Sequence, residues 1–292
     1  MLRGLYTAAA GMIAQERRHD AITNNIANIN TPGYKEGNAA LRSFPEMLIY
    51  LVNGEQNAPP QHIGRLATGV FAEEAVTLFS QGDIQTTNNA SDFALVSDIP
   101  VFDAQGNRIP FDQTGKYVDP NGQVFFQPQA FFTLASPTDP DERLYTRDGS
   151  FHVNEQNELV TANGYRVLGA DGQPIVLDRP LDAINVAADG TLMDADGFPL
   201  TQLFISRIEN PNRLIPETGG VYRLDADAAQ PAQVNPDDQV IVRQGAIERS
   251  NVDPIQSMVD LMTALRAYEA NQKVIQFYDR SLDKAVNEVG RV

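Results

Sequence analysis

The stretch from Asp253 to Val292 constrains the fold of this 292-residue chain more than any other. After Pro254 it contains no proline, and its only glycine is Gly290. Pro254 suits the first position of a helix, and Asp253 before it, with Gln256 three residues on, resembles a capping box. The stretch therefore predicts one uninterrupted helix, which at about 1.5 Å per residue would be roughly 58 Å long.

Apolar residues recur along this helix at alternating spacings of three and four, which is typical of a coiled-coil seam. The predicted seam consists of Met258, Leu261, Leu265, Tyr268, Gln272, Ile275, Asp279, Leu282, Val286 and Val289. Burying its eight apolar side chains is worth on the order of 12–24 kcal/mol, so we expect the seam to be covered. The cover could be the chain's own globular domain or other helices. Val259, Val274 and Phe277 lie off the seam, which favours more than one neighbour.

A second helix is predicted from residue 1 to about residue 29, because alanine and leucine dominate this segment. Its apolar positions are Leu2, Leu5, Ala9, Met12, Ile22, Ile26 and Ile29. The small residues from Ala8 to Gly11 would let another backbone approach closely. Pro32 disfavours the α conformation at Thr31, and Gly33 permits a turn, so the helix is expected to stop near Asn30.

Four asparagines crowd into the seven residues before this stop. Asn24 and Asn28 fall on one helical face, where their amides could bridge to other subunits. A plainer alternative is that Asn30 tolerates a left-handed cap and the others are solvated. We predict that Asn24 and Asn28 belong, with the apolar positions of both helices, to an assembly interface.

The middle of the chain has the texture of an antiparallel β domain, because short strand-like runs alternate with turn dipeptides. These dipeptides are Asn121-Gly122, Asp148-Gly149, Asn163-Gly164, Asp171-Gly172, Asp189-Gly190 and Asp196-Gly197. The candidate strands are 124–126, 131–134, 151–153, 159–161, 166–168, 175–177, 184–186 and 203–208. The predicted fold is therefore α+β, with long terminal helices pairing as a coiled-coil-like bundle around a central, mainly antiparallel β domain.

The predicted boundaries follow the same patterns. Residues 1–30 and 246–292 supply the two helices of an assembly domain, residues 31–75 are a connector without strong periodicity, and residues 76–245 form the β domain. The net charge of −16 resides entirely in the middle, since residues 1–50 sum to +1 and residues 251–292 to −1. An acidic middle disfavours nucleic acid and anionic membrane as partners. No stretch is apolar enough for membrane insertion, no secretory signal pattern is visible, and the lack of cysteine excludes disulfides and thiolate chemistry.

The two ends of the chain resemble the flagellar basal-body rod and hook family. The resemblance rests on Leu5 to Ala9, on the run from Asn24 to Lys35, and on Ser250 to Lys273. Interior stretches at 80–84, 145–151 and 159–165 are similar to the distal-rod branch, and residues 44–48 with 270–292 look closest to FlhO-type rod proteins of Gram-positive bacteria. One departure is the segment of about thirty residues, 98–128, which the distal-rod pattern lacks.

The resemblance implies a structural subunit that polymerises through its terminal helices into a hollow axial shaft of the basal body. Its partners would be its own copies, other rod and hook proteins, and the flagellar type III export apparatus, which exports such proteins without a cleaved signal peptide. The location would be the basal body, where the shaft crosses the cell envelope. A hook-type component or a rod-capping, adhesin-like component is the alternative.

An enzyme is the main rival class, and a shaft that crosses peptidoglycan makes a glycosidase-type carboxylate pair worth considering. Nothing in the sequence selects such a pair. His19, His62 and His152 lack the spacing of a metal site, and Ser150 and His152 share one side of a predicted strand without a nucleophile-elbow motif. No phosphate-binding glycine loop occurs. We therefore predict no catalytic residue, no metal and no cofactor.

Overall fold

The computed structural model describes residues 2–51, 61–73, 75–103, 106–112, 114–119, 122–139, 142–226, 228, 230–235 and 238–289. At 2–3, 49–51, 61–63 and 288–289 the description is confined to the backbone. The chain divides into two compact units. Unit 1 comprises Met1–Ala27, Gly37–Val76 and Asp253–Val292, and unit 2 comprises Asn28–Glu36 and Thr77–Val252. Within the predicted connector, the segment from Asn53 to Pro60, which we expect to be a loop, lies entirely outside the described residues.

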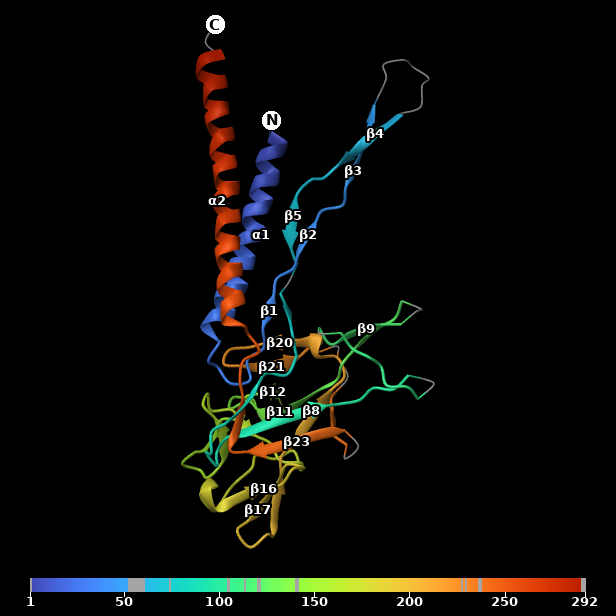
Figure 1. Ribbon diagram of the computed structural model, residues 1–292. Coiled ribbons are helices and arrows are strands. Elements are labelled where there is room, and N and C mark those ends of the chain that lie inside the picture. Colours follow the sequence, from blue (N-terminus) through green and yellow to red (C-terminus); the bar gives the residue numbers. More distant parts are fainter. Residues whose placement is uncertain are drawn as a thin grey trace. The chain divides into compact units, whose positions relative to one another are not determined.

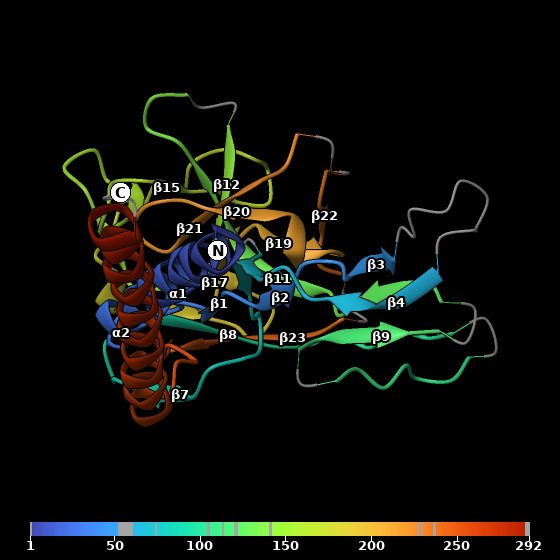
Figure 2. The ribbon, with the colours of Figure 1, turned by 90° about the horizontal axis from the view of Figure 1, so that it is seen from above.

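Unit 1 is built on two long helices, α1 (Leu2–Ala27) and α2 (Pro254–Lys284), which lie side by side and antiparallel (Figures 1 and 2). The predicted cap of α2 is confirmed, since the Asp253 carboxylate accepts hydrogen bonds from the backbone N–H groups of Ile255 and Gln256. The capping box is wrong in one respect, because the Gln256 side chain donates to Asp260 instead of reaching back to the cap. After Lys284 the helix widens into a π-helical segment, Ala285–Val289.

Short antiparallel strands occupy the predicted connector. They are β1 (Gly37–Asn38), β2 (Leu41–Ser43), β3 (Met47–Leu51), β4 (Gln61–Leu66) and β5 (Val70–Ala72). Strands β2 and β5 form a ribbon beside α1, and β3 and β4 continue it away from α2 (Figures 1 and 2). Strand β6 (Val76–Thr77) crosses from unit 1 to unit 2. The connector's weak periodicity reflects strands of two to six residues whose described side chains are a mixture of exposed and half-buried ones.

Unit 2 is an antiparallel β body in every pairing that its described residues make. Its first strands are β7 (Ile84–Thr86), β8 (Phe93–Asp98), β9 (Lys116–Val118), β10 (Val124–Phe126), β11 (Gln129–Ala135), β12 (Arg143–Thr146), β13 (Phe151–Val153), β14 (Leu159–Thr161) and β15 (Arg166–Val167). The strands that follow are β16 (Ile184–Val186), β17 (Thr191–Asp194), β18 (Pro199–Gln202), β19 (Ile205–Ile208), β20 (Leu214–Pro216), β21 (Val221–Leu224), β22 (Ala232–Gln233), β23 (Gln239–Gln244) and β24 (Ala246–Glu248). Two 3-10 turns, η1 (Leu181–Ala183) and η2 (Pro211–Arg213), lie among these later strands.

The main sheet runs in the order β13-β14-β15-β11-β12-β21-β20, with β19 also paired to β11 and β22 to β19. Smaller sheets join β16-β17-β18, β23-β8, β24-β7 and β10-β9. Strand β11 is the centre of the body, since all seven of its residues are buried. The core around it includes Phe93, Phe132, Leu134 and Leu159, each 0% exposed.

Most of the predicted strands and turns are present. The prediction of a strand at 175–177 is wrong, because this segment makes only isolated bridges, such as that between Glu158 and Val176. The glycines at 122, 164, 172, 190 and 197 have φ between 76° and 82°, as turn glycines do. Gly149 is different: it has no positive φ, and a Cβ there would lie 1.6 Å from the carbonyl oxygen of Phe93. Glycine is needed at this position for close packing against β8, and the hairpin turn predicted there is wrong.

Candidate assembly surface

The antiparallel helical pair is held in register by contacts at three levels. Gly4 of α1 lies against Tyr278 of α2, where an added Cβ would be 2.0 Å from the phenol oxygen. Seven residues further along α1, an added Cβ at Gly11 would be 2.9 Å from the side-chain amide nitrogen of Asn271. Nearer the other end, the Arg18 guanidinium meets the Asp260 carboxylate at 3.4 Å. The small residues of α1 therefore admit the larger side chains of α2, as the close-approach prediction requires.

The face of α2 that meets α1 is shifted from the predicted seam. Its residues, buried or half-buried, are Ser257, Leu261, Ala264, Tyr268, Asn271, Ile275, Tyr278 and Leu282. Four of the ten predicted seam residues therefore lie on this face, namely Leu261, Tyr268, Ile275 and Leu282. Five others, Met258, Leu265, Gln272, Asp279 and Val286, are exposed, and the side chain of Val289 lies outside the described residues. Every second residue of the predicted seam thus lies on the face of α2 that meets α1, and the residues between them are exposed.

An apolar stripe on α2 faces away from α1. It consists of Ile255, Met258, Val259, Met262 and Leu265, which are 76%, 55%, 46%, 51% and 42% exposed. Spacings of three and four residues put these side chains on one side of a helix, about half a turn from the α1-facing residues. Contiguous exposed apolar surface of this kind marks an interaction site. Further along α2, Val274, Phe277 and Val286 are also exposed.

The two helices differ in length, so α2 extends past the start of α1 (Figure 1). Gly4 lies opposite Tyr278, which leaves the turns of α2 after about Leu282 beyond the first residue of α1. Val286 in this overhang is 70% exposed. The side chains of Leu2 and Val289, both predicted interface residues, lie outside the described residues.

The remaining predicted interface residues of the N-terminal region are placed as follows. Leu5, Ala9, Met12, Ile26, Asn28 and Ile29 are half-buried, Ile22 is buried and Asn24 is exposed. The Thr31 hydroxyl donates to the Asn28 side-chain oxygen at 3.1 Å, which occupies one acceptor site of that amide within the chain. Sequence reasoning missed Asn25, which is 3% exposed. Its side chain makes two 2.9 Å hydrogen bonds with Gly37, one to the carbonyl and one from the N–H.

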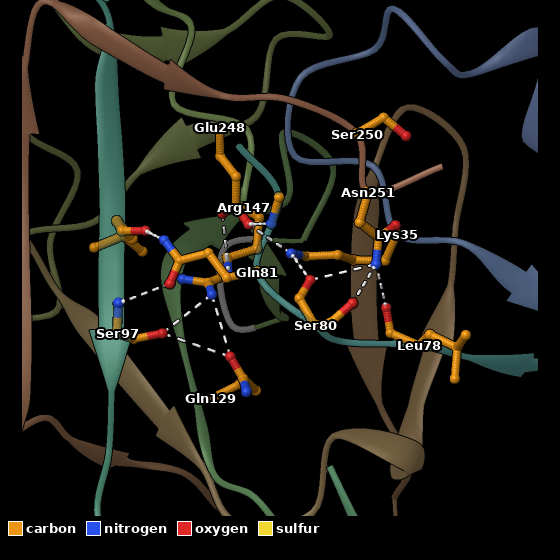
Figure 3. Close-up of polar contacts among 12 residues, drawn as sticks. Lys35, Leu78, Ser80, Gln81, Ser97, Gln129, Arg147, Glu248, Ser250 and Asn251 are labelled. Carbon is orange, nitrogen blue, oxygen red and sulfur yellow. Dashed lines mark hydrogen bonds and ion pairs between the residues drawn. The ribbon is translucent and has the colours of Figure 1, made fainter. Parts of the chain in front are cut away.

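A group of buried charged residues lies inside unit 2 and consists of Lys35, Arg147 and Glu248 (Figure 3). We call this group the ion cluster. All three side chains are 0% exposed. The Lys35 ammonium lies 2.6 Å from one Glu248 oxygen, and the Arg147 Nε lies 3.5 Å from the other. Arg147 also donates to Ser97 and Gln129. Three segments more than a hundred residues apart in sequence therefore meet through charge.

The charges within the ion cluster do not balance, since two cations share one carboxylate. Burial lowers the pKa of Lys35 from its usual 10.5 to about 8, against the attraction of Glu248 and with the repulsion of Arg147. Burial alone would raise the pKa of Glu248, but the charges of Arg147 and Lys35 outweigh it and hold that pKa below its usual value. Glu248 is therefore ionised at neutral pH. Sequence reasoning missed this cluster, because each of the three residues has an oppositely charged neighbour in the sequence and none stands out as a buried charge.

The candidate enzymatic residues make no comparable site. His152 is exposed on β13, His19 is half-buried with its Nδ1 3.7 Å from Asp20, and the His62 side chain lies outside the described residues. No helix in the described part of the chain is long and apolar enough to cross a membrane.

Comparison with known proteins gives matches along the whole chain. Residues 5–35 match the family described as flagella basal body rod protein, residues 122–194 the flagellar hook protein FlgE/F/G D1 domain, and residues 243–288 the flagellar basal body rod FlgEFG protein C-terminal region. The flagellar hook-basal body complex protein FlhO of Bacillus subtilis is 34% identical over 100% of both chains. The rod protein FlgG of Borreliella burgdorferi is 30% identical over 98% of both, and FlhP of Bacillus subtilis 29% identical over 97% of both.

An antiparallel β body and a helical pair with an exposed apolar stripe, together with these matches, define a structural protein of the bacterial flagellum and not an enzyme. The chain belongs to the flagellar basal-body rod and hook protein family, and within it to the FlhO type. Membership of this family indicates a location in the flagellar basal body and assembly with other rod and hook components.

Proposed function

We propose that the chain is a subunit of the distal part of the rod, and that its terminal helices bundle in a coiled-coil-like manner with those of its own copies and of other rod and hook proteins. In this proposal residues 1–30 and 246–292 form the assembly domain of a hollow axial shaft. Residues 76–245 form the body outside it, and 31–75 connect the two. The observation that carries the proposal is the exposed apolar stripe of α2 in a chain of this family.

The stripe supports assembly because one side of α2 is covered within the chain and the other is not. Burying five such side chains would contribute several kcal/mol per subunit contact, at roughly 25 cal/mol for each Å² of apolar surface. A contact between unlike surfaces propagates as a helical rod when the rotation that relates neighbouring subunits does not close into a ring. The acidic residues of the body repel one another and favour growth through the helices alone.

We also propose that the protein reaches the rod through the flagellar type III export apparatus without a cleaved signal peptide. Similarity to FlhO and FlgG over nearly the whole of each chain supports this, since their names place them in the same axial complexes. Deleting residues 1–30 and 250–292 together should abolish incorporation into basal bodies. Incorporation of the truncated protein would contradict assembly through the helices and favour the adhesin-like alternative.

A single substitution tests the stripe itself. Leu265→Asp introduces a charge at its end and should abolish incorporation and motility, while the thermal transition of unit 2 stays unchanged. Ser281→Asp is the matched control, because Ser281 is an exposed polar residue of the same helix, sixteen residues beyond Leu265 and outside the stripe. It should assemble as the wild type does. Equal incorporation of the two variants would show that the stripe is not an assembly surface.

A further inference from the structure

The polypeptide passes between the two units at four points, after residues 27, 36, 76 and 252. Next to three of these points, those after residues 36, 76 and 252, unit 2 residues form hydrogen bonds with one another. The N–H of Leu78 donates to the carbonyl of Glu36 at 2.8 Å, and the N–H of Glu36 donates to the side-chain oxygen of Asn251 at 2.7 Å. The segments that lead toward the two helices therefore start from one place on unit 2.

Asn251 is the residue that ties these segments together (Figure 3). Its side-chain oxygen accepts from Glu36, while its nitrogen donates to the carbonyl of Leu78 at 2.9 Å and to the hydroxyl of Ser80 at 3.0 Å. One amide thus uses both its acceptor and its donors on backbone that comes from two distant parts of the chain. Neither aspartate nor a shorter side chain can reproduce this set of bonds.

Residues of the ion cluster form further hydrogen bonds with the same segments. The Lys35 ammonium donates to the carbonyl of Ser80 at 2.8 Å, and the Glu248 carboxylate accepts from the N–H of Gly82 at 2.9 Å. The backbone carbonyl of Glu248 accepts from the N–H of Gly33 at 2.8 Å. Each of the three segments, 33–36, 78–82 and 248–251, is bonded to both of the others. We call these segments the junction.

We propose that Asn251, supported by Lys35 and Glu248, is a positioning residue for assembly. It holds the chain segments that lead to α1 and α2 at fixed points on unit 2, so that both helices are presented to neighbouring subunits from a defined origin. Its side chain belongs to unit 2 and lies outside the apolar stripe, so it acts through the junction and not by contact with a partner. This inference rests on the proposed assembly function.

The test combines a local and a functional measurement on full-length protein. Hydrogen exchange of the Glu36 and Leu78 amides reports opening of the junction, and exchange of the β11 amides reports opening of the core. The variants are Asn251→Ala and Asn251→Asp, of which the second keeps the side-chain shape but replaces the amide donors with a charged acceptor oxygen. Both are produced in bacteria whose own copy of the gene is deleted, and their amount in purified basal bodies is measured.

We expect junction amides to exchange about tenfold faster or more, as loss of one hydrogen bond implies, with β11 exchange unchanged and incorporation reduced about tenfold. Asn163→Ala is the matched control, because the Asn163 amide also donates to a backbone carbonyl of unit 2, that of Gly219, and does not touch the junction. This control should assemble normally.

Three results would overturn the proposal. Wild-type incorporation of both Asn251 variants would do so, as would an equal loss of incorporation in Asn163→Ala. Accelerated β11 exchange in both Asn251 variants would show that Asn251 merely stabilises the body. If Leu265→Asp fails to incorporate while the Asn251 variants succeed, only the positioning role is wrong. If Leu265→Asp also incorporates, assembly through the helices is wrong as well.

Discussion

Unit 2 and unit 1 differ in how completely each covers its own apolar residues. In unit 2, Phe93, Phe132, Leu134 and Leu159 are fully buried around β11. Both cations of the ion cluster are paired with Glu248, although the Arg147 Nη1 is buried without a hydrogen bond. In unit 1, α2 packs one side on α1 and leaves the stripe from Ile255 to Leu265 in solvent. Unit 2 thus encloses a core, with Phe102, Phe198 and Leu200 among the apolar residues exposed outside it, whereas the helical pair of unit 1 leaves a continuous apolar stripe on one helix exposed. The difference supports the proposal that the chain assembles through the exposed stripe of unit 1.

The largest expected effect comes from Glu248→Gln, which tests whether unit 2 depends on its buried charges. The substitution leaves Lys35 and Arg147 buried side by side without the carboxylate, and removing one partner of a buried pair costs about 3–5 kcal/mol. We expect the free energy of unfolding of unit 2, measured from β11 hydrogen exchange, to fall by this amount. Glu155→Gln, at an exposed turn, should change it by less than about 0.5 kcal/mol. A loss below about 1 kcal/mol in Glu248→Gln would mean that the cluster is dispensable.

The comparison between the units is tested most directly by the same substitution in each. Leu134→Ala removes a side chain that is 0% exposed in β11 and should lower the free energy of unfolding of unit 2 by about 2–5 kcal/mol. Leu265→Ala removes one that is 42% exposed, and in the unassembled chain it should cost about 1 kcal/mol or less. Urea unfolding of both variants measures the contrast. Similar losses at the two positions would mean that the α2 stripe is already covered in the free chain.

A smaller effect is expected from pH, through Lys35. Because its pKa is about 8 in the folded protein and 10.5 when unfolded, the unfolded state binds more protons between these values. The stability of unit 2 should therefore rise with pH above 8, by about 2 kcal/mol between pH 7.5 and 9.5 at about 1.4 kcal/mol per pH unit. Burial raises the pKa values of Tyr34, Tyr145 and Tyr222, whose opposite contribution begins only near pH 10.

Lys35→Met provides the control for this pH dependence. It leaves the Arg147–Glu248 pair electrically neutral, so the cost in stability should be small, and the rise between pH 7.5 and 9.5 should disappear. Urea unfolding at a series of pH values measures both. A wild type whose stability is flat or falls over this interval would show that Lys35 keeps an ordinary affinity for protons.

Much of the fold could be predicted from local pattern. The α+β class, both terminal helices, the Asp253 cap and strands such as β10, β13, β14 and β16 follow from periodicity and turn chemistry. The errors have physical causes. Gly149 reads as a turn glycine, but tertiary packing against Phe93 requires it. The strands of the connector are too short to show an alternating pattern.

The candidate site was harder to predict, because its contacts are set by tertiary structure. Spacing places Leu261 and Leu265 on one seam, yet the packing of α2 on α1 covers the first and exposes the second. Nothing near Lys35, Arg147 or Glu248 in sequence shows that they meet. Whether the predicted interface residues contact other subunits, and whether the predicted domain boundaries describe folding units, remain predictions.

The overhang of α2 beyond α1 makes the two ends of the helical pair chemically unlike. At one end α1 and α2 are joined through the chain to unit 2, and at the other the π-helical segment that continues α2 and carries Val286 extends past the start of α1. A column of such molecules stacked in one orientation has a head and a tail, and a newcomer meets a different surface at each. A difference in length between two helices is therefore enough to give such a column a direction of growth.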